Sequence, residues 1–182
     1  MAAGKPRNNN NKDKNRERER SPYDQRVVEL ARVTRVTEGG KRMSFRACVV
    51  VGNRQGLVGY AIAKGADVQA AIGKAVRKAE KSLITVPMVK QTIPHAIETK
   101  FKAARILLKP APSGSGVIAG GTARIVLELA GIPNISGKTL GSGNKINNVH
   151  ATFKALSTLA AGTWRLRKMQ QSKANRKKVA TK

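Results

Sequence analysis

The chain has few of the residues that build disulfide frameworks, metal modules or membrane helices. It contains one cysteine, and aromatic residues make up 3% of the sequence. One cysteine cannot form a disulfide framework or a cysteine-rich zinc module. No apolar run approaches the roughly 20 residues of a membrane-spanning helix, and the N-terminus lacks the apolar segment of a secretory signal. We therefore expect no membrane association, no metal and a cytoplasmic location.

Acidic residues are also scarce, and basic residues dominate. There are 36 Lys and Arg against 10 Asp and Glu, which gives a formal net charge of +26. Residues 163–182 hold 8 basic and no acidic side chains, while residues 21–162 hold 21 basic and 7 acidic ones. A folded body with this excess repels itself unless an anion compensates the charge. Because phosphate neutralisation releases counterions, the pattern predicts a protein that binds nucleic acid.

The two ends of the chain are low in complexity. A run of asparagines at residues 8–11 is followed by alternating Arg and Glu, and residues 165–182 contain only scattered apolar side chains. Neither end can bury a core, so we expect both to be disordered when free, with Trp164 closing the last helix. We predict a basic tail over 1–22, a first domain over 23–88, a second domain over 89–162 and a basic tail over 163–182.

The first half of the body reads as three strands and a helix. Strands are predicted over 27–36, 42–51 and 57–63, joined by glycine turns at 38–41 and 52–56 that expose cations. Phe45 shares a strand face with Val49 and Val51, which favours a core position over stacking on a base. Asp67 is expected to cap a helix with apolar residues from Val68 to Leu83. Its opposite face is basic, with Lys74, Arg77, Lys78 and Lys81.

The second half predicts a small α/β sandwich with its helices on one face of the sheet. Strands are expected over 95–100, 103–109 and 132–139, and helices over 122–130 and after Asn144 or Asn147. Gly131 and Pro133 should end the first of these helices. The whole body is therefore expected to belong to the α+β class.

Residues that could carry catalysis do not form a recognisable site. Gly137-Lys138-Thr139 resembles the end of a nucleotide-binding loop, but Ile132 stands where that motif needs glycine. Cys48 lies in a valine-rich strand and is expected to be a small buried hydrophobe. His95 and His150 lie far apart, and Glu128 is expected to hold Arg124 or a backbone N–H. We predict that the chain is not an enzyme and needs no cofactor.

Several stretches together resemble one known family. They are Arg32 to Arg42, Ser44 to Gly52, Val86-Pro87, Gln91 to His95, Pro110-Ala111, Gly114 to Gly121, Arg124 to Gly131, Leu140 to Ser142, and Asn144. In this order they resemble the bacterial small-subunit ribosomal protein S-five family over about residues 27–160. The sequence departs from the family pattern at residues 52–56 and 60–64 and at Lys145.

The resemblance implies a fold, a location and partners. It implies a double-stranded-RNA-binding-like N-terminal domain and a C-terminal domain with a left-handed β-α-β crossover. It also implies a place at the head/body junction of the small ribosomal subunit, near the mRNA entry, and a role in translational accuracy. The implied partners are ribosomal RNA, ribosomal proteins four and eight, and mRNA near the entry site.

The predicted binding residues follow from the cationic turns, the basic helix face and the resemblance. For RNA they are Arg35, Gly39, Gly40, Lys41, Arg42, Ser44, Arg46, Arg54, Gln55, Lys64, Lys74, Arg77 and Lys78. Of these, the resemblance matches residues 39–42 to the family's extended RNA-contacting loop. It also implies that Gly114, Ser115, Gly116 and Arg124 face protein four.

Two other classes of protein share part of this pattern. A DNA-compacting, histone-like protein would have the charge and the tails, but would not need two halves with glycine turns. A phosphate-handling enzyme would use the glycine-rich stretch before residue 122. Competition between duplex RNA and duplex DNA would separate the first class, and a nucleotide-turnover assay would test the second.

Overall fold

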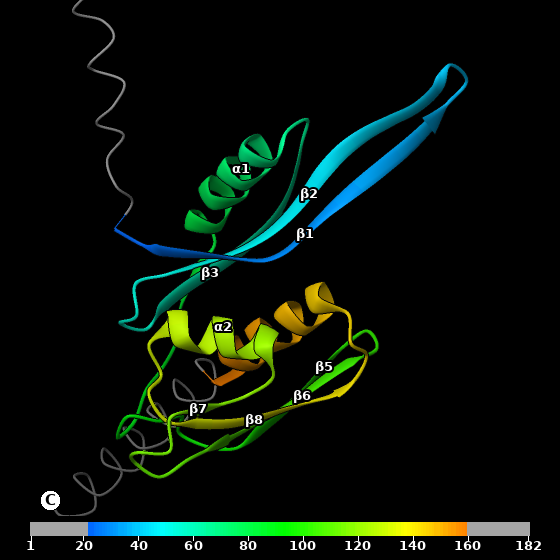
Figure 1. Cartoon of the computed structure of the whole chain (residues 1–182). Coiled ribbons are helices and arrows are strands. Elements are labelled where there is room, and N and C mark those ends of the chain that lie inside the picture. Colours follow the sequence, from blue (N-terminus) through cyan, green and yellow to red (C-terminus); the bar gives the residue numbers. More distant parts are fainter. Residues whose placement is uncertain (1–21, 160–182) are drawn as a thin grey trace, which may run out of the picture.

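The computed structural model describes residues 22–159, which form two four-stranded sheets and three helices. This architecture confirms the predicted α+β class (Figure 1). The first sheet holds β1 (Asp24–Thr37), β2 (Gly40–Gly52), β3 (Leu57–Gly65) and β4 (Leu83–Thr85), all antiparallel and in that order. None of the helices in this part of the chain has the length and apolar content needed to cross a membrane.

The predicted three-strand meander is confirmed, but the fourth strand replaces the end of the predicted helix. Helix α1 (Val68–Glu80) ends at Lys81, and Leu83 pairs with Gly59 in β4. The extension of the helix to Leu83 was therefore wrong. An apolar residue that continues a helical spacing is equally suited to a strand, and here the edge of β3 decides its place.

The second sheet has the order β5-β6-β8-β7. It consists of β5 (Ile97–Phe101), β6 (Ala104–Pro110), β8 (Ile135–Gly141) and the short β7 (Val117–Ile118). Strand β7 runs parallel to β8, and α2 (Gly121–Ala130) connects them, so the predicted β-α-β unit is present. The left-handedness of its crossover stays a prediction.

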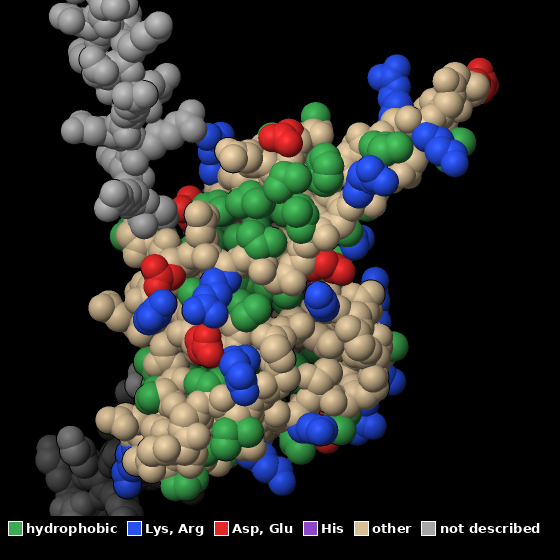
Figure 2. All heavy atoms as spheres, in the orientation of Figure 1, with side chains coloured by type: hydrophobic (Ala, Val, Ile, Leu, Met, Phe, Trp, Pro, Cys, Tyr) green, Lys and Arg blue, Asp and Glu red, His purple; other side chains and the backbone are tan. Residues whose placement is uncertain are grey.

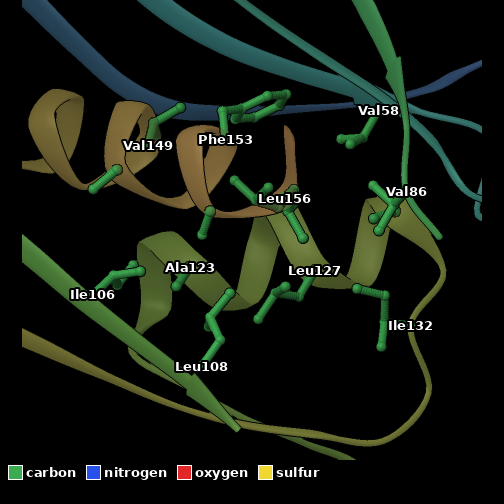
Figure 3. Close-up of a cluster of buried hydrophobic side chains, with 14 of the residues drawn as sticks. Val58, Val86, Ile106, Leu108, Ala123, Leu127, Ile132, Val149, Phe153 and Leu156 are labelled. Atoms are coloured by element: carbon green, nitrogen blue, oxygen red, sulfur yellow. The ribbon is translucent and has the colours of Figure 1, made fainter. Parts of the chain in front are cut away.

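Four layers stack along the molecule, with helices alternating with sheets (Figure 1). Helix α1 covers one face of the first sheet, while α2 and the last helix, described over 145–159, lie between the two sheets. The predicted arrangement, with both helices of the second half on one face of its sheet, is therefore observed. Figure 3 shows the larger core, where α2 and the last helix bury their apolar sides against β6 and the first sheet.

Strand β2 is buried on both faces near its end, which the sequence did not predict. Ala47, Val49 and Val51 pack under α1, as expected from the alternation. Cys48 and Val50 face the larger core instead of solvent. The burial of Cys48 was predicted, but the sequence analysis did not assign Cys48 and Val50 to a core on the other face of the strand. It missed the second buried face because the layer of helices beneath belongs to the other half of the chain.

The helix ends show which capping predictions hold. Asn144 caps the last helix, because its Oδ1 accepts the N–H groups of Ile146 and Asn147 at 3.0 and 3.3 Å. Asp67 stands at the start of α1, but its side chain makes no capping hydrogen bond. Gly131 ends α2 with φ of 80°, as predicted. Trp164 and both tails lie outside the described residues.

The two halves meet at closely approaching backbones. The N–H of Arg54 donates to the carbonyl of Leu129 at 3.0 Å, and the N–H of Gly56 donates to that of Ala130 at 2.9 Å. A Cβ on Gly131 would lie 2.0 Å from the Arg54 carbonyl oxygen. The turn between β2 and β3 therefore satisfies carbonyl groups at the end of α2, which helix geometry leaves without partners.

Candidate nucleic-acid interface

A long β-hairpin arm projects from the first sheet. Strand β2 pairs with β3 only from Phe45 onward, whereas β1 and β2 continue to pair up to Thr37 and Gly40. The segment 33–44 is therefore a two-stranded arm, which Figure 1 shows extending beyond the body. Gly40 has φ of 126°, a conformation that favours glycine at the turn. The predicted turn at 38–41 thus becomes the tip of the arm.

The register of the strands separates the arm and the adjoining sheet into two faces. Successive side chains of a strand point to opposite faces, and cross-strand partners share a face. Arg35 is paired with Arg42, Val33 with Ser44, and Arg46 with Lys64. We call the face with the following five residues the cationic face: Arg35, Arg42, Ser44, Arg46 and Lys64.

Two pairs of like charges lie directly opposite each other on the cationic face. They are Arg35 with Arg42, and Arg46 with Lys64. Directly opposed like charges destabilise a sheet. Glu29 compensates part of this charge, with 3.7 Å between its Oε2 and a guanidinium nitrogen of Arg46. Among residues 22–159, no carboxylate forms a salt bridge with Arg35, Arg42 or Lys64. This face is therefore well suited to a bound polyanion.

The predicted residues of the second turn lie far from the arm tip. Arg54 and Gln55 follow β2, whose 13 residues span about 40 Å at roughly 3.3 Å per residue. The guanidinium Nε of Arg54 lies 2.7 Å from a carboxylate oxygen of Asp24. The backbone N–H of Gln55 donates to the side-chain Oδ1 of Asn53 at 2.8 Å. Arg54 also has φ of 56°, and the hydrogen bonds from its N–H and that of Gly56 hold this turn against the second half.

The basic side of α1 is exposed, as the helical spacing predicts. Lys74, Arg77 and Lys78 are all exposed, whereas Ala71, Ala75 and Ala79 are fully buried against the sheet. Helix α1 covers the face of the first sheet opposite to the cationic face. The three cations of the helix and the five residues of the cationic face therefore lie on different sides of the molecule.

The glycine-rich loop before α2 is organised by a buried side chain that the sequence analysis missed. The Oδ1 of Asn134 accepts the N–H groups of Gly114 and Gly116 at 2.9 and 3.2 Å. Its Nδ2 donates to the carbonyl of Gln91 at 3.4 Å. Asn134 is 4% exposed, and the sequence analysis had placed it in the strand expected over 132–139 without giving it a role. The loop is therefore fixed in shape, and Arg124 is exposed one helical turn beyond it.

Residues considered for catalysis are placed in structural roles. Residues 137–139 lie inside β8 and do not precede a helix, so the likeness to a nucleotide-binding loop fails. Burial, with the nearby Glu29 carboxylate, raises the pKa of the Cys48 thiol to about 11. Glu128 pairs with Arg26 at 3.3 Å, which corrects the expected pairing with Arg124. Within residues 22–159, no three His, Cys, Asp or Glu side chains cluster as metal ligands.

Comparisons with known proteins match both halves of the chain. Residues 23–87 match the domain family "Ribosomal protein S5, N-terminal domain", and residues 99–163 match "Ribosomal protein S5, C-terminal domain". These two matches cover most of the chain. They define it as a protein of the small ribosomal subunit.

Individual relatives agree with these matches. The chain is 51% identical over 141 residues to "Small ribosomal subunit protein uS5c" of Emiliania huxleyi, covering 77% of this chain and 89% of the relative. It is 49% identical to the proteins of the same name from Cyanidium caldarium and Spinacia oleracea, over 138 and 141 residues. These alignments cover 75% and 77% of this chain, and 82% and 46% of the relatives. The chain belongs to the ribosomal protein S5 family, and it is a structural constituent of the small ribosomal subunit, not an enzyme.

Proposed function

We propose that the chain binds ribosomal RNA of the small subunit mainly through the cationic face of its hairpin arm and the adjoining sheet. The observation that carries this proposal is the pairing of Arg35 with Arg42 and of Arg46 with Lys64. A phosphate between two opposed cations turns their repulsion into two charge-assisted contacts. The side chains of an arm cannot read the bases of an A-form helix in its deep major groove. Recognition therefore rests on phosphates and 2′-hydroxyl groups.

The remaining predicted residues extend this proposal. Gly40, with φ of 126°, lets the arm turn tightly, and Gly39 and Lys41 are proposed to approach the RNA at the tip. The turn with Arg54 and Gln55 and the cations of α1 are proposed as separate, weaker phosphate contacts. Weaker contact is expected at Arg54 because Asp24 already neutralises its charge.

Finer aspects of the location are also part of the proposal. The resemblance supports a position at the head/body junction near the mRNA entry, with proteins four and eight as neighbours. It also supports a role in translational accuracy together with protein four. The fixed loop of Gly114, Ser115 and Gly116, followed by the exposed Arg124, is proposed as the surface for protein four. We further propose that the two domains span residues 23–88 and 89–162. We also propose that the ribosome to which this protein belongs is cytoplasmic.

The double variant Arg35→Ala with Arg42→Ala tests the RNA contact. Each phosphate contact that is lost should flatten the dependence of log K on log salt by about one unit, so about two in total. The measurement is a salt titration of binding to small-subunit ribosomal RNA by fluorescence anisotropy. Competition with duplex DNA in the same assay distinguishes a ribosomal protein from a DNA-compacting one.

A matched control removes the same charge elsewhere. Lys109→Ala with Lys138→Ala changes two exposed cations of the second sheet and should leave the salt dependence nearly unchanged. If both double variants flatten the salt dependence equally, only the net charge matters and the proposal of a cationic face is wrong.

A further inference from the structure

The face of the arm and of the adjoining part of β1 that lies opposite to the cationic face exposes an apolar strip. Val27, Leu30, Val36 and Met43 are 43%, 46%, 72% and 55% exposed. The register places Val27 beside Val49, Leu30 beside Ala47, Met43 beside Thr34 and Val36 beside Lys41. All four therefore share the face that α1 covers further along the sheet. We call these four residues the apolar strip.

The strip continues into a groove beside α1. Helix α1 lies over β2 and β3, and its half-buried Val68, Ile72 and Val76 border the uncovered part of β1. The groove has a volume of about 540 Å³ and reaches Gln25 on β1. Figure 2 shows the corresponding apolar patch between α1 and the start of the arm. Contiguous exposed apolar surface of this kind typically marks a site of interaction.

The chemistry of the surface favours a protein over RNA as its occupant. Its exposed residues are aliphatic, and Phe45 is half-buried in the core beneath α1, so the strip offers no aromatic platform for a base. The arginines opposed across the strands lie on the other face. The two faces of the arm therefore differ in chemistry, one for phosphate and one for apolar side chains.

The charges around the strip define the partner further. Arg32 pairs with Phe45, and Lys41 with Val36, so both cations lie on the same face as the strip. Arg77 and Glu80 both line the groove, so the excess of positive charge lies along the strip itself. No carboxylate of β1 or β2 shares this face, since Asp24 lies opposite Gly52 and Glu29 lies opposite Cys48. A complementary partner therefore has an apolar face flanked by acidic side chains.

We propose that the apolar strip and the groove beside α1 bind an amphipathic helix of another ribosomal protein, with acidic residues beside its apolar face. The nine-residue distance from Val27 to Val36 is about 30 Å along a strand, which matches a helix of about 20 residues. Such a helix continues the layer that α1 begins and covers the bare part of β1. This interface goes beyond the proposed RNA contact and lies on the opposite side of the arm.

Site-specific photocrosslinking in small ribosomal subunits tests the occupant. The full chain carries benzoylphenylalanine at Leu30 in one preparation and at Arg42 in another. Leu30 is expected to crosslink to a protein segment that mass spectrometry identifies as an amphipathic, acid-flanked helix. A crosslink from Leu30 to RNA, to a protein segment of other chemistry, or to nothing overturns the interface. A missing RNA crosslink from Arg42 instead counts against the proposed RNA contact.

A pair of variants measures the contribution of the strip. Val27→Thr with Leu30→Thr should raise the fraction of the protein released from subunits at high salt about tenfold, because apolar contacts persist when phosphate contacts are screened. The matched control is Val89→Thr, an exposed valine at 48% in the connection between the halves. Equal release of the double variant and the control overturns the proposal. Circular dichroism verifies that both variants remain folded.

Discussion

At the scale of single residues, an aromatic cluster joins the two halves. The hydroxyl of Tyr60 on β3 lies 2.7 Å from Nδ1 of His150 on the last helix. His150 stacks on Phe101 with ring centroids 4.6 Å apart, and Tyr60 contacts Phe153 at 4.2 Å. Burial lowers the pKa of His150, and the neighbouring Lys102 lowers it further. The neutral imidazole is therefore the form that fits this contact.

This pKa shift predicts a loss of stability in mild acid. The unfolded chain binds a proton at His150 more readily than the folded protein, so the free energy of unfolding falls as the pH drops below about 6.5. The stabilisation is fully present above that pH. Urea unfolding at pH 7.5 and pH 5.5 measures the change, and His150→Asn should show less of it. An identical pH dependence in both proteins would contradict the role of His150.

At the scale of elements, α1 shows how glycines differ by their surroundings. Gly73 lies in the middle of the helix, and a Cβ there would meet nothing within 4 Å. A Cβ on Gly65 would lie 2.6 Å from the backbone nitrogen of Ala71. Gly65 therefore permits the close approach of β3 and α1, whereas Gly73 has no such role among residues 22–159.

The two glycines should respond in opposite ways to substitution. Gly73→Ala is expected to stabilise the isolated protein by about 0.5–1 kcal/mol, because alanine loses less backbone entropy in a helix. Gly65→Ala should destabilise it, because neither backbone can move without losing contacts. Chemical unfolding followed by circular dichroism measures both changes. If Gly73→Ala destabilises the protein, the open space around Gly73 does not explain its role, and this prediction is wrong.

At the scale of the whole molecule, backbone contact between the halves makes them a single unit. Gly52 and Gly131 both allow this contact, since a Cβ on Gly52 would lie 2.3 Å from the Leu129 carbonyl oxygen. The hydrogen bonds from Arg54 and Gly56 to the end of α2 depend on the same approach. The arm is therefore held in a fixed position relative to the second half, which matters for a protein that contacts RNA and protein on different sides.

Gly131→Ala tests this coupling. Alanine in the left-handed conformation costs about 1–2 kcal/mol, and the clash with Arg54 adds to that cost. We expect the free energy of unfolding, measured in urea, to fall by more than about 2 kcal/mol. We also expect the two halves to unfold less cooperatively.

The control is Gly114→Ala, because Gly114 has φ of 90° but open space around its Cβ position. Gly114→Ala therefore has the cost of placing alanine at a positive φ but causes no clash with a neighbouring backbone. If both variants lose the same stability, the contact between the halves contributes little.

Local patterns predicted the three long strands of the first sheet, the helices α1 and α2, a cap at Asn144 or Asn147, and the burial of Cys48. These features depend on the alternation, spacing and turn residues within one segment, which are visible in the sequence. The charge of the body predicted nucleic-acid binding, and the family motifs predicted the family. The sequence analysis named the RNA-binding residues individually. It could not tell which of them share a face, because that depends on the register between the strands.

The tertiary structure alone decided which of these residues lie together. Residues 35 and 42 oppose each other only because the hairpin turns at 38–39, and Glu128 meets Arg26 only because α2 lies under the first sheet. The second buried face of β2 and the role of Asn134 likewise depend on segments distant in sequence. A sequence determines local conformation through nearby residues, whereas contacts between distant segments depend on how the elements stack, which no single segment encodes.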